Sequence, residues 1–252
     1  MSARITLAIA ARVLIQLRRD RRTLAMLMVL PCLILALLWW MFEGRAGGQG
    51  FRSLGPPLLA LIPFVVMFLV TSVTTLRERS SGTLERLLSM PTGKGDFLGG
   101  YAVAFGVVAC VQSVLAVLLC HFVLDLQVSG PLWMLVVVAV VDAVLGTALG
   151  LFVSAFARTE FQAVQFMPAL VIPQLLLCGL FVPRDAMPRV LEVVSDVLPL
   201  SYAVDAMSAV ATTTGTALGG VTGDVWSDIA VVVAFALAGL AVGAATLRRR
   251  TP

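Results

Sequence analysis

The sequence predicts an all-α membrane protein with six transmembrane helices, and three observations support this fold class. Hydrophobic residues occupy 60% of the 252 positions and charged residues 13%, whereas about 25% are charged in soluble domains. The apolar residues are concentrated in six runs long enough to cross a bilayer. Arginines gather in the segments on one side of these runs. We expect one transmembrane domain over residues 1–252.

The predicted spans follow from the positions of the apolar runs. They lie at residues 24–41, 58–76, 98–124, 132–156, 162–182 and 229–247. Two spans contain small residues at the spacing that allows close helix contact, Gly146-x-x-x-Gly150 and Gly239-x-x-x-Gly243. This spacing favours packing within one subunit.

The cations predict the orientation in the membrane. Of the 18 Lys and Arg residues, all but Arg45, Arg52, Arg184 and Arg189 lie before the first span, after the last, or between spans 2 and 3 or 4 and 5. Such segments are cytoplasmic, so both termini should be inside the cell. The net charge of +4 is thus a topology signal, and no nucleic-acid partner is expected. The excess of Arg over Lys, with abundant Ala and Val, is typical of a high-GC bacterial genome. A bacterial cell membrane is therefore the expected location.

The N-terminal segment, residues 1–23, predicts an amphipathic helix. Arg4, Arg12 and Arg19 fall on one side of a helical projection. The apolar residues on the other side are Leu7, Ile9, Val13, Leu14 and Leu17. Such a helix can lie along the inner membrane surface. It is either a charged topology anchor or a helix that docks on a partner.

Residues 77–91 form a polar stretch between spans 2 and 3. Leu84, Leu87 and Leu88 recur at helical spacing, and Pro91 ends the pattern. A connection between helices can be much shorter. The segment is therefore interpreted as a second amphipathic helix that contacts a partner, with a solvated loop as the alternative.

Residues 183–226 are predicted to lie outside the cell. They contain an apolar segment that is too short to span a bilayer and is interrupted by Pro188 and Pro199. An interfacial helix within the loop is expected here from the periodicity.

Two polar groups lie deep within the predicted spans. Folding spans 3 and 4 into a hairpin places Gln112 at the depth of Asp142, which predicts a hydrogen-bonded pair because a lone buried charge is costly. A role of Asp142 in substrate contact or proton coupling is the alternative. His121 and Asp125, one turn apart, predict an interfacial ion pair.

Catalytic and metal-binding motifs are not found in the sequence. The Gly93–Lys94 pair is followed by Gly95 and lacks the spacing of a phosphate-binding loop. Cys32, Cys110, Cys120 and Cys178 fall inside spans without paired spacing. We expect no catalysis by this chain alone and no bound metal or cofactor.

Two motifs resemble a known family. LRERSSGTLERLLSMP at 76–91 with FLGGY at 97–101, and CGLFVPRDAMP at 178–188 with LPLSYAVDAM at 198–207, look like the corresponding segments of ABC-2 type permeases. The order and spacing agree over essentially the whole chain. Among these permeases, the chain resembles the daunorubicin-resistance type of bacterial drug exporter.

The resemblance implies a partner and a contact site. In that family, the helix after span 2 is a coupling helix that sits in a groove of a separate ATP-binding subunit, present in two copies, which binds ATP and Mg²⁺. The N-terminal helix is an elbow helix that makes a second contact. The implied coupling residues are Arg77, Glu78, Arg79, Gly82, Thr83, Glu85 and Arg86.

The resemblance also implies a two-fold dimer with an identical or paralogous permease, surrounded by membrane lipids. Spans 1 and 5 would meet and enclose the transport path, and short re-entrant helices within residues 183–226 would cap its exit. Candidate path residues on span 5 are Gln162, Gln165, Phe166, Met167 and Gln174.

The predicted function is the permease subunit of an ATP-driven exporter of hydrophobic or amphipathic small molecules, such as antibiotics. A lipid or glycolipid exporter is the alternative cargo class. An ion-coupled carrier built around Asp142 and His121, or a membrane scaffold or immunity protein, are alternatives of other kinds.

Overall fold

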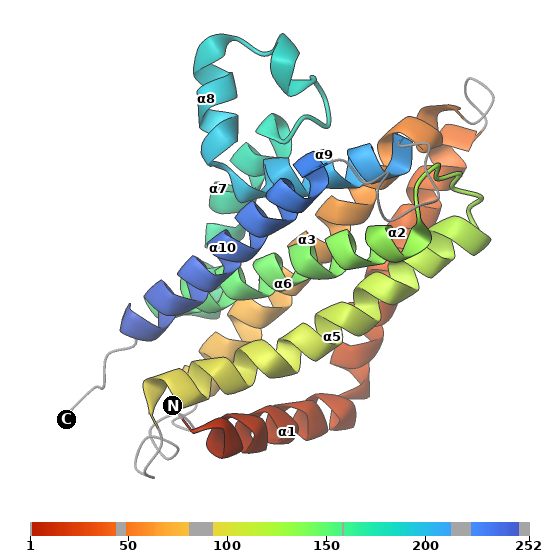
Figure 1. The fold of residues 1–252 in the computed structure, drawn as a ribbon. Helices are drawn as coiled ribbons and strands as arrows, with labels where there is room; N and C mark the ends of the chain where they lie inside the picture. Colours follow the sequence, from red (N-terminus) through yellow and green to blue (C-terminus); the bar gives the residue numbers. More distant parts are fainter. Residues whose placement is uncertain (1, 44–48, 81–92, 158, 213–222, 247–252) are drawn as a thin grey trace.

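The computed structural model describes residues 2–43, 49–80, 93–157, 159–212 and 223–246, and these fold into helices without a strand (Figure 1). The elements are α1 (Ala3–Arg19), α2 (Arg21–Glu43), α3 (Gln49–Ser80), α5 (Lys94–Phe122), α6 (Leu132–Phe156), α7 (Glu160–Leu177), the 3-10 turn η2 (Arg184–Ala186), α8 (Arg189–Val197), α9 (Pro199–Thr212) and α10 (Gly223–Thr246). The predicted all-α fold class is confirmed.

Six of these helices are long and apolar enough to cross a membrane: α2, α3, α5, α6, α7 and α10. The predicted number of spans is confirmed, but three boundaries differ by five residues or more. Helix α10 begins at Gly223 instead of residue 229. Helix α3 begins at Gln49 instead of residue 58, because Phe51 is buried in the core and Gly55 lies against Leu126. Helix α7 ends at Leu177 instead of residue 182, and Gly179 (φ +90°) then turns the chain toward η2.

Helices α3, α5 and α6 form the centre of the bundle. Between 50% and 61% of their most apolar windows is buried, compared with 17–22% for α2, α7 and α10. The peripheral helices expose large apolar side chains, such as Met26, Trp40 and Leu237. Lipid tails are as apolar as these side chains, so their exposure on a membrane-spanning helix is expected.

Two glycines allow α6 to approach α3 closely. A Cβ atom at Gly146 would lie 2.4 Å from the Phe64 carbonyl oxygen, and one at Gly150 would lie 2.6 Å from the Phe68 carbonyl oxygen. The first small-residue motif therefore packs within the chain. At Gly239 the corresponding nearest atom is 3.7 Å away and at Gly243 it is 3.4 Å away, so the second motif makes only ordinary contacts.

The two ends of the bundle carry different elements (Figure 1). Helix α1 lies across the end where α3 finishes and α5 begins, which we call the α1 end. Helix α8 projects at the opposite end, which we call the α8 end.

The α8 end contains the short helices predicted between spans 5 and 6, although residues 213–222 lie outside the described part. Pro183 and Pro188 are the N-caps of η2 and α8, and Pro199 is the first residue of α9. Leu198 is extended, as expected for a residue that precedes proline. The axes of α8 and α9 consequently differ by 92°.

Candidate functional site

The C-terminal end of α3 is connected to two other helices through Glu78. The Tyr101 hydroxyl of α5 donates a 2.5 Å hydrogen bond to Glu78 Oε2, and the Arg12 guanidinium of α1 lies 3.4 Å from the same oxygen. Tyr101 is 1% exposed and Glu78 is 8% exposed. A buried carboxylate requires such partners, so this contact fixes α3 to α1 and α5 at the α1 end.

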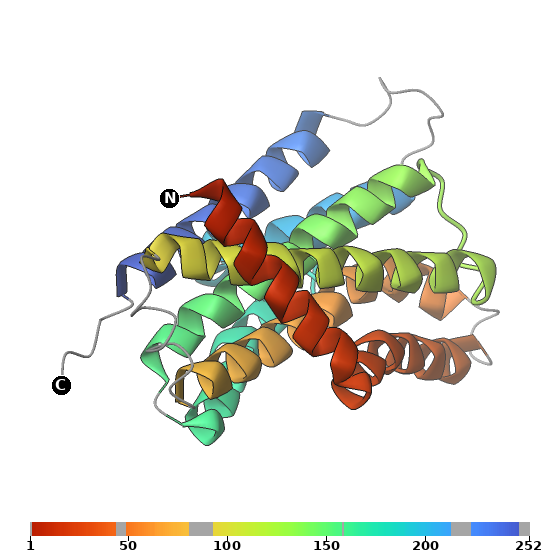
Figure 2. The ribbon, with the colours of Figure 1, turned by 90° about the horizontal axis from the view of Figure 1, so that it is seen from below.

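Helix α1 crosses α5 at a close contact (Figure 2). A Cβ atom at Gly100 would lie 2.6 Å from the Ile9 side chain, and Asp96 accepts a 2.7 Å hydrogen bond from the backbone nitrogen of Ser2. The buried face of α1 consists of Ile9, Ala10, Val13 and Leu17. This predicted helix is present, and its apolar face is used inside the chain.

One predicted member of that apolar face does not belong to it. The Leu7 side chain is 60% exposed, because the rotation of α1 is set by the seating of Ile9 on Gly100. Ile15 is also exposed.

Arg77 connects α3 to α7. Its Nε and Nη2 atoms donate to the two carboxylate oxygens of Glu160, each at 2.9 Å. Glu160 follows the N-cap Thr159, whose hydroxyl accepts from the Gln162 backbone nitrogen. A carboxylate is favourable in the first turn of a helix, and the paired bonds connect Arg77 to the first turn of α7. The end of α3 thus contacts three helices.

The predicted coupling residues are only partly covered by the structure. Arg77, Glu78 and Arg79 belong to the last turn of α3, which continues to Ser80, so the polar segment begins as a continuation of span 2. The side chain of Arg79 and the residues Gly82, Thr83, Glu85 and Arg86 lie outside the described part. The predicted helix over 77–91 therefore stays a prediction beyond Ser80.

The predicted Gln112–Asp142 hydrogen bond does not form. Both side chains are buried, and none of their polar atoms has a partner among the described residues. Ala143 belongs to the same buried cluster as Phe105 and Ala109 of α5, and successive residues project about 100° apart around a helix. The side chain of Asp142 is therefore turned by about 100° around the helix axis from that of Ala143. Instead, Ser113 of α5 bonds to the Ala139 carbonyl of α6.

We expect Asp142→Asn to retain the fold and, if the permease function predicted from the sequence holds, most of the transport. The amide is nearly isosteric, and the carboxyl group that it replaces has no partner to lose. Thermal unfolding in detergent and a transport assay measure the two effects. Loss of transport in a variant that unfolds at the wild-type temperature would instead assign Asp142 a role in substrate contact or proton coupling.

The predicted ion pair between His121 and Asp125 is also absent from the described residues. His121 Nδ1 has no hydrogen-bond partner, and its ring packs edge-on against Phe122. Helix α5 ends at Phe122 and Asp125 adopts a positive φ of 48°, so the one-turn spacing that the prediction assumed is not helical here.

The five predicted path residues on span 5 do not share one face. Gln165 is exposed, whereas Phe166 and Met167 are half-buried against the core. Gln174 is buried, donates to the Leu170 carbonyl and accepts from the Leu200 backbone nitrogen at the start of α9. Gln174 therefore stabilises the α7–α9 contact, and Gln162 lies half-buried in the first turn of α7.

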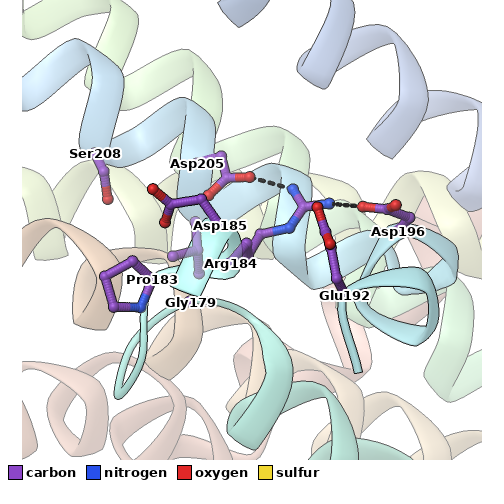
Figure 3. A pocket seen from close by; sticks show the side chains of 9 residues that line it. Gly179, Pro183, Arg184, Asp185, Glu192, Asp196, Asp205 and Ser208 are labelled. Carbon is purple, nitrogen blue, oxygen red and sulfur yellow. Dashed lines mark hydrogen bonds and ion pairs between the residues drawn. The ribbon is translucent and has the colours of Figure 1, made fainter. Parts of the chain in front are cut away.

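An ion-pair network at the α8 end was not predicted from the sequence (Figure 3). The Arg184 guanidinium bonds to Asp196 of α8 and Asp205 of α9. It also lies 5.2 Å from the ring centroid of Tyr202, whose hydroxyl donates to the Asp196 carbonyl at 2.7 Å. Burial raises the pKa of Asp205, although the Arg184 contact opposes this change. The network lines a cavity of about 430 Å³.

We expect Arg184→Gln to loosen α8 selectively. Ser195 is the only buried residue of α8, so the helix is held mainly by polar contacts. Hydrogen exchange of residues 189–197 should become at least tenfold faster than in the wild type, while exchange in α6 stays unchanged. Arg189→Gln, which changes the same charge on exposed α8, is the matched control; equal acceleration in both variants would contradict the assignment.

Comparison with known proteins identifies the family of the chain. Residues 5–211 match the model of the ABC-2 type transporter family. The chain belongs to this family. It is thus a multi-pass membrane protein of the ABC-2 permease family, and the expected resemblance is confirmed.

Relatives in this family include transporters from bacteria and a eukaryote. The chain is 26% identical over 180 residues to the probable multidrug ABC transporter permease YbhS of Escherichia coli, covering 71% of the chain and 47% of YbhS. It is 25% identical over 189 residues to the linearmycin resistance permease protein LnrN of Bacillus subtilis, covering 74% and 47%. It is also 25% identical over 164 residues to ABC transporter G family member 20 of Dictyostelium discoideum, covering 65% and 22%. The chain spans less than half the length of each of these relatives.

Proposed function

We propose that this ABC-2 family chain is the permease subunit of an ATP-driven exporter of hydrophobic or amphipathic small molecules, including antibiotics. The match over residues 5–211 carries the proposal, and relatives named as multidrug and linearmycin resistance permeases support the cargo class. ATP and Mg²⁺ would be bound by a separate ATP-binding subunit, two copies of which would serve a pair of permeases in a bacterial cell membrane.

The α1 end is the proposed site of contact with the ATP-binding subunit, on the cytoplasmic side. Residues 77–91 continue from α3, whose end is bonded to α1 and α5 through Glu78 and to α7 through Arg77. A displacement applied to this segment would therefore act on four helices together. Packed elements of this kind move as rigid bodies, so closure of the ATP-binding subunits would reorient the spans.

The proposed path lies between two copies of the chain. The exposed side chains of α7, among them Gln165 and Phe161, and the exposed face of α2 would border it. Apolar and thioether side chains adapt to varied amphipathic cargo.

The test uses the full chain co-expressed with an ABC-type ATP-binding protein from the same genome. We expect the two to co-purify in detergent and to export an amphipathic dye from vesicles in a vanadate-sensitive manner. A variant with residues 81–90 scrambled should lose co-purification and export, while a variant with Arg248–Arg250 changed to glutamine serves as a control for general charge. Export that needs a pH gradient and no ATP would contradict the proposal and favour an ion-coupled carrier.

A further inference from the structure

A second cavity lies at the α1 end, separate from the network around Arg184. It has a volume of about 360 Å³ and is lined by residues of α1, the α1–α2 joint, α2, α3 and α5. Its wall combines apolar and aromatic groups, such as Val13, Leu17 and Phe105, with both signs of charge. This mixture matches an amphipathic ligand.

The position of the cavity places it at the depth of lipid headgroups. Thr74 and Glu78 belong to the last turns of the span formed by α3, and Tyr101 lies near the start of the span formed by α5. The ends of transmembrane helices meet the interfacial region of the bilayer. Helix α1, which covers the cavity, is amphipathic and precedes the first span.

The charged side chains that line the cavity differ in how many of their hydrogen-bonding positions are already used within the chain. Arg77 is held by both oxygens of Glu160, and Glu78 accepts from Tyr101 at 2.5 Å. Arg12, in contrast, has Glu78 as its one partner among the described residues, at 3.4 Å through a single nitrogen. A guanidinium group has five N–H donors arranged to match phosphate oxygens. Most donors of Arg12 are therefore available to an anion.

Asp20, at the α1–α2 joint, is the group in the cavity lining that can accept a hydrogen bond from a ligand. Its two oxygens accept from the Thr23 hydroxyl at 2.6 Å and from the Thr23 backbone nitrogen at 3.2 Å. These bonds from Thr23 lower the pKa of Asp20, so the carboxylate is ionised at neutral pH. A carboxylate has about four acceptor positions, which leaves room for a further donor.

We propose that this cavity binds the headgroup of a zwitterionic phospholipid that carries a phosphate and a primary ammonium group. The phosphate accepts from Arg12, the ammonium donates to Asp20, and the acyl chains follow the apolar side of the lining at Val13 and Leu17. The equal numbers of cations and anions in the lining, Arg12 and Arg77 against Asp20 and Glu78, favour a zwitterion over an anionic lipid. The proposal does not depend on the cargo or on the ATP-binding subunit.

The experiment is native mass spectrometry of the full chain in detergent with equal amounts of phosphatidylethanolamine, phosphatidylglycerol and phosphatidylcholine. We expect phosphatidylethanolamine to be retained most strongly. Arg12→Gln should weaken its retention about tenfold, the effect of losing a charge-assisted bond. Arg4→Gln is the matched control, because Arg4 is exposed on the same helix and does not line the cavity. Asp20→Asn should remove the preference over phosphatidylcholine, whose quaternary ammonium has no N–H donor.

A second variant keeps the test independent of folding. Gln16 lines the cavity and is exposed, so Gln16→Glu should repel the phosphate without removing a packing contact. Equal weakening by Arg12→Gln and Arg4→Gln, strongest retention of phosphatidylglycerol, or unchanged retention in Gln16→Glu would overturn the proposal. Competition by millimolar inorganic phosphate would likewise overturn it, since the site would then recognise free phosphate and not a lipid.

Discussion

Gly146→Leu is expected to prevent stable folding of the chain, and Gly146→Ala to lower the free energy of unfolding by about 1–3 kcal/mol, the usual cost of overpacking. The added Cβ atom would lie 2.4 Å from the carbonyl oxygen of Phe64, which is backbone and cannot rotate away. Helices α3 and α6 would have to separate along the centre of the bundle. Unfolding in mixed micelles measures the change.

The matched control for this prediction is Gly106→Ala on α5. A Cβ atom at Gly106 would meet no atom within 4 Å, and alanine is favoured over glycine in a helix by up to about 1 kcal/mol. The control should therefore equal or exceed the wild type in stability. If both alanine variants had the same stability, close approach at Gly146 would not be what holds α3 against α6.

Glu78→Ala is expected to break the contact of α3 with α1 and α5 at the α1 end. Under the proposed function, it should also abolish most transport. It leaves the buried Tyr101 hydroxyl without its acceptor and removes the one described partner of Arg12. An unsatisfied buried group costs about 1–3 kcal/mol, so the variant should unfold at a lower temperature. Export activity and the unfolding temperature measure the two consequences.

Two further variants distinguish the effect of losing the helix contacts at Glu78 from the effect of lower folding stability. Tyr101→Phe removes the 2.5 Å bond and keeps the Arg12–Glu78 contact, while Arg12→Gln weakens that contact and keeps the bond to Tyr101. If the contact between α3 and the other helices transmits movement, each should lower transport by less than Glu78→Ala. Wild-type transport in a folded Glu78→Ala variant would contradict the proposed role of this contact.

The sequence by itself determined the helical fold class and the number of spans. A bilayer cannot hydrogen-bond to the backbone, so each long apolar run must form a helix whatever its neighbours are. The same local reasoning found the helix at Ala3–Arg19 and the proline-separated helices α8 and α9. It also identified Gly146 as a packing residue, because close approach requires a small side chain wherever the partner lies.

Tertiary structure alone decided which polar groups meet. Tyr101 and Glu78 are 23 residues apart, Arg77 and Glu160 are 83 apart, and no local pattern relates them. The rotation of each helix in the bundle, which all its neighbours set together, left Asp142 without a hydrogen-bond partner among the described residues and left Leu7 exposed. Depth in the membrane follows from counting residues, whereas direction around a helix axis follows only from packing.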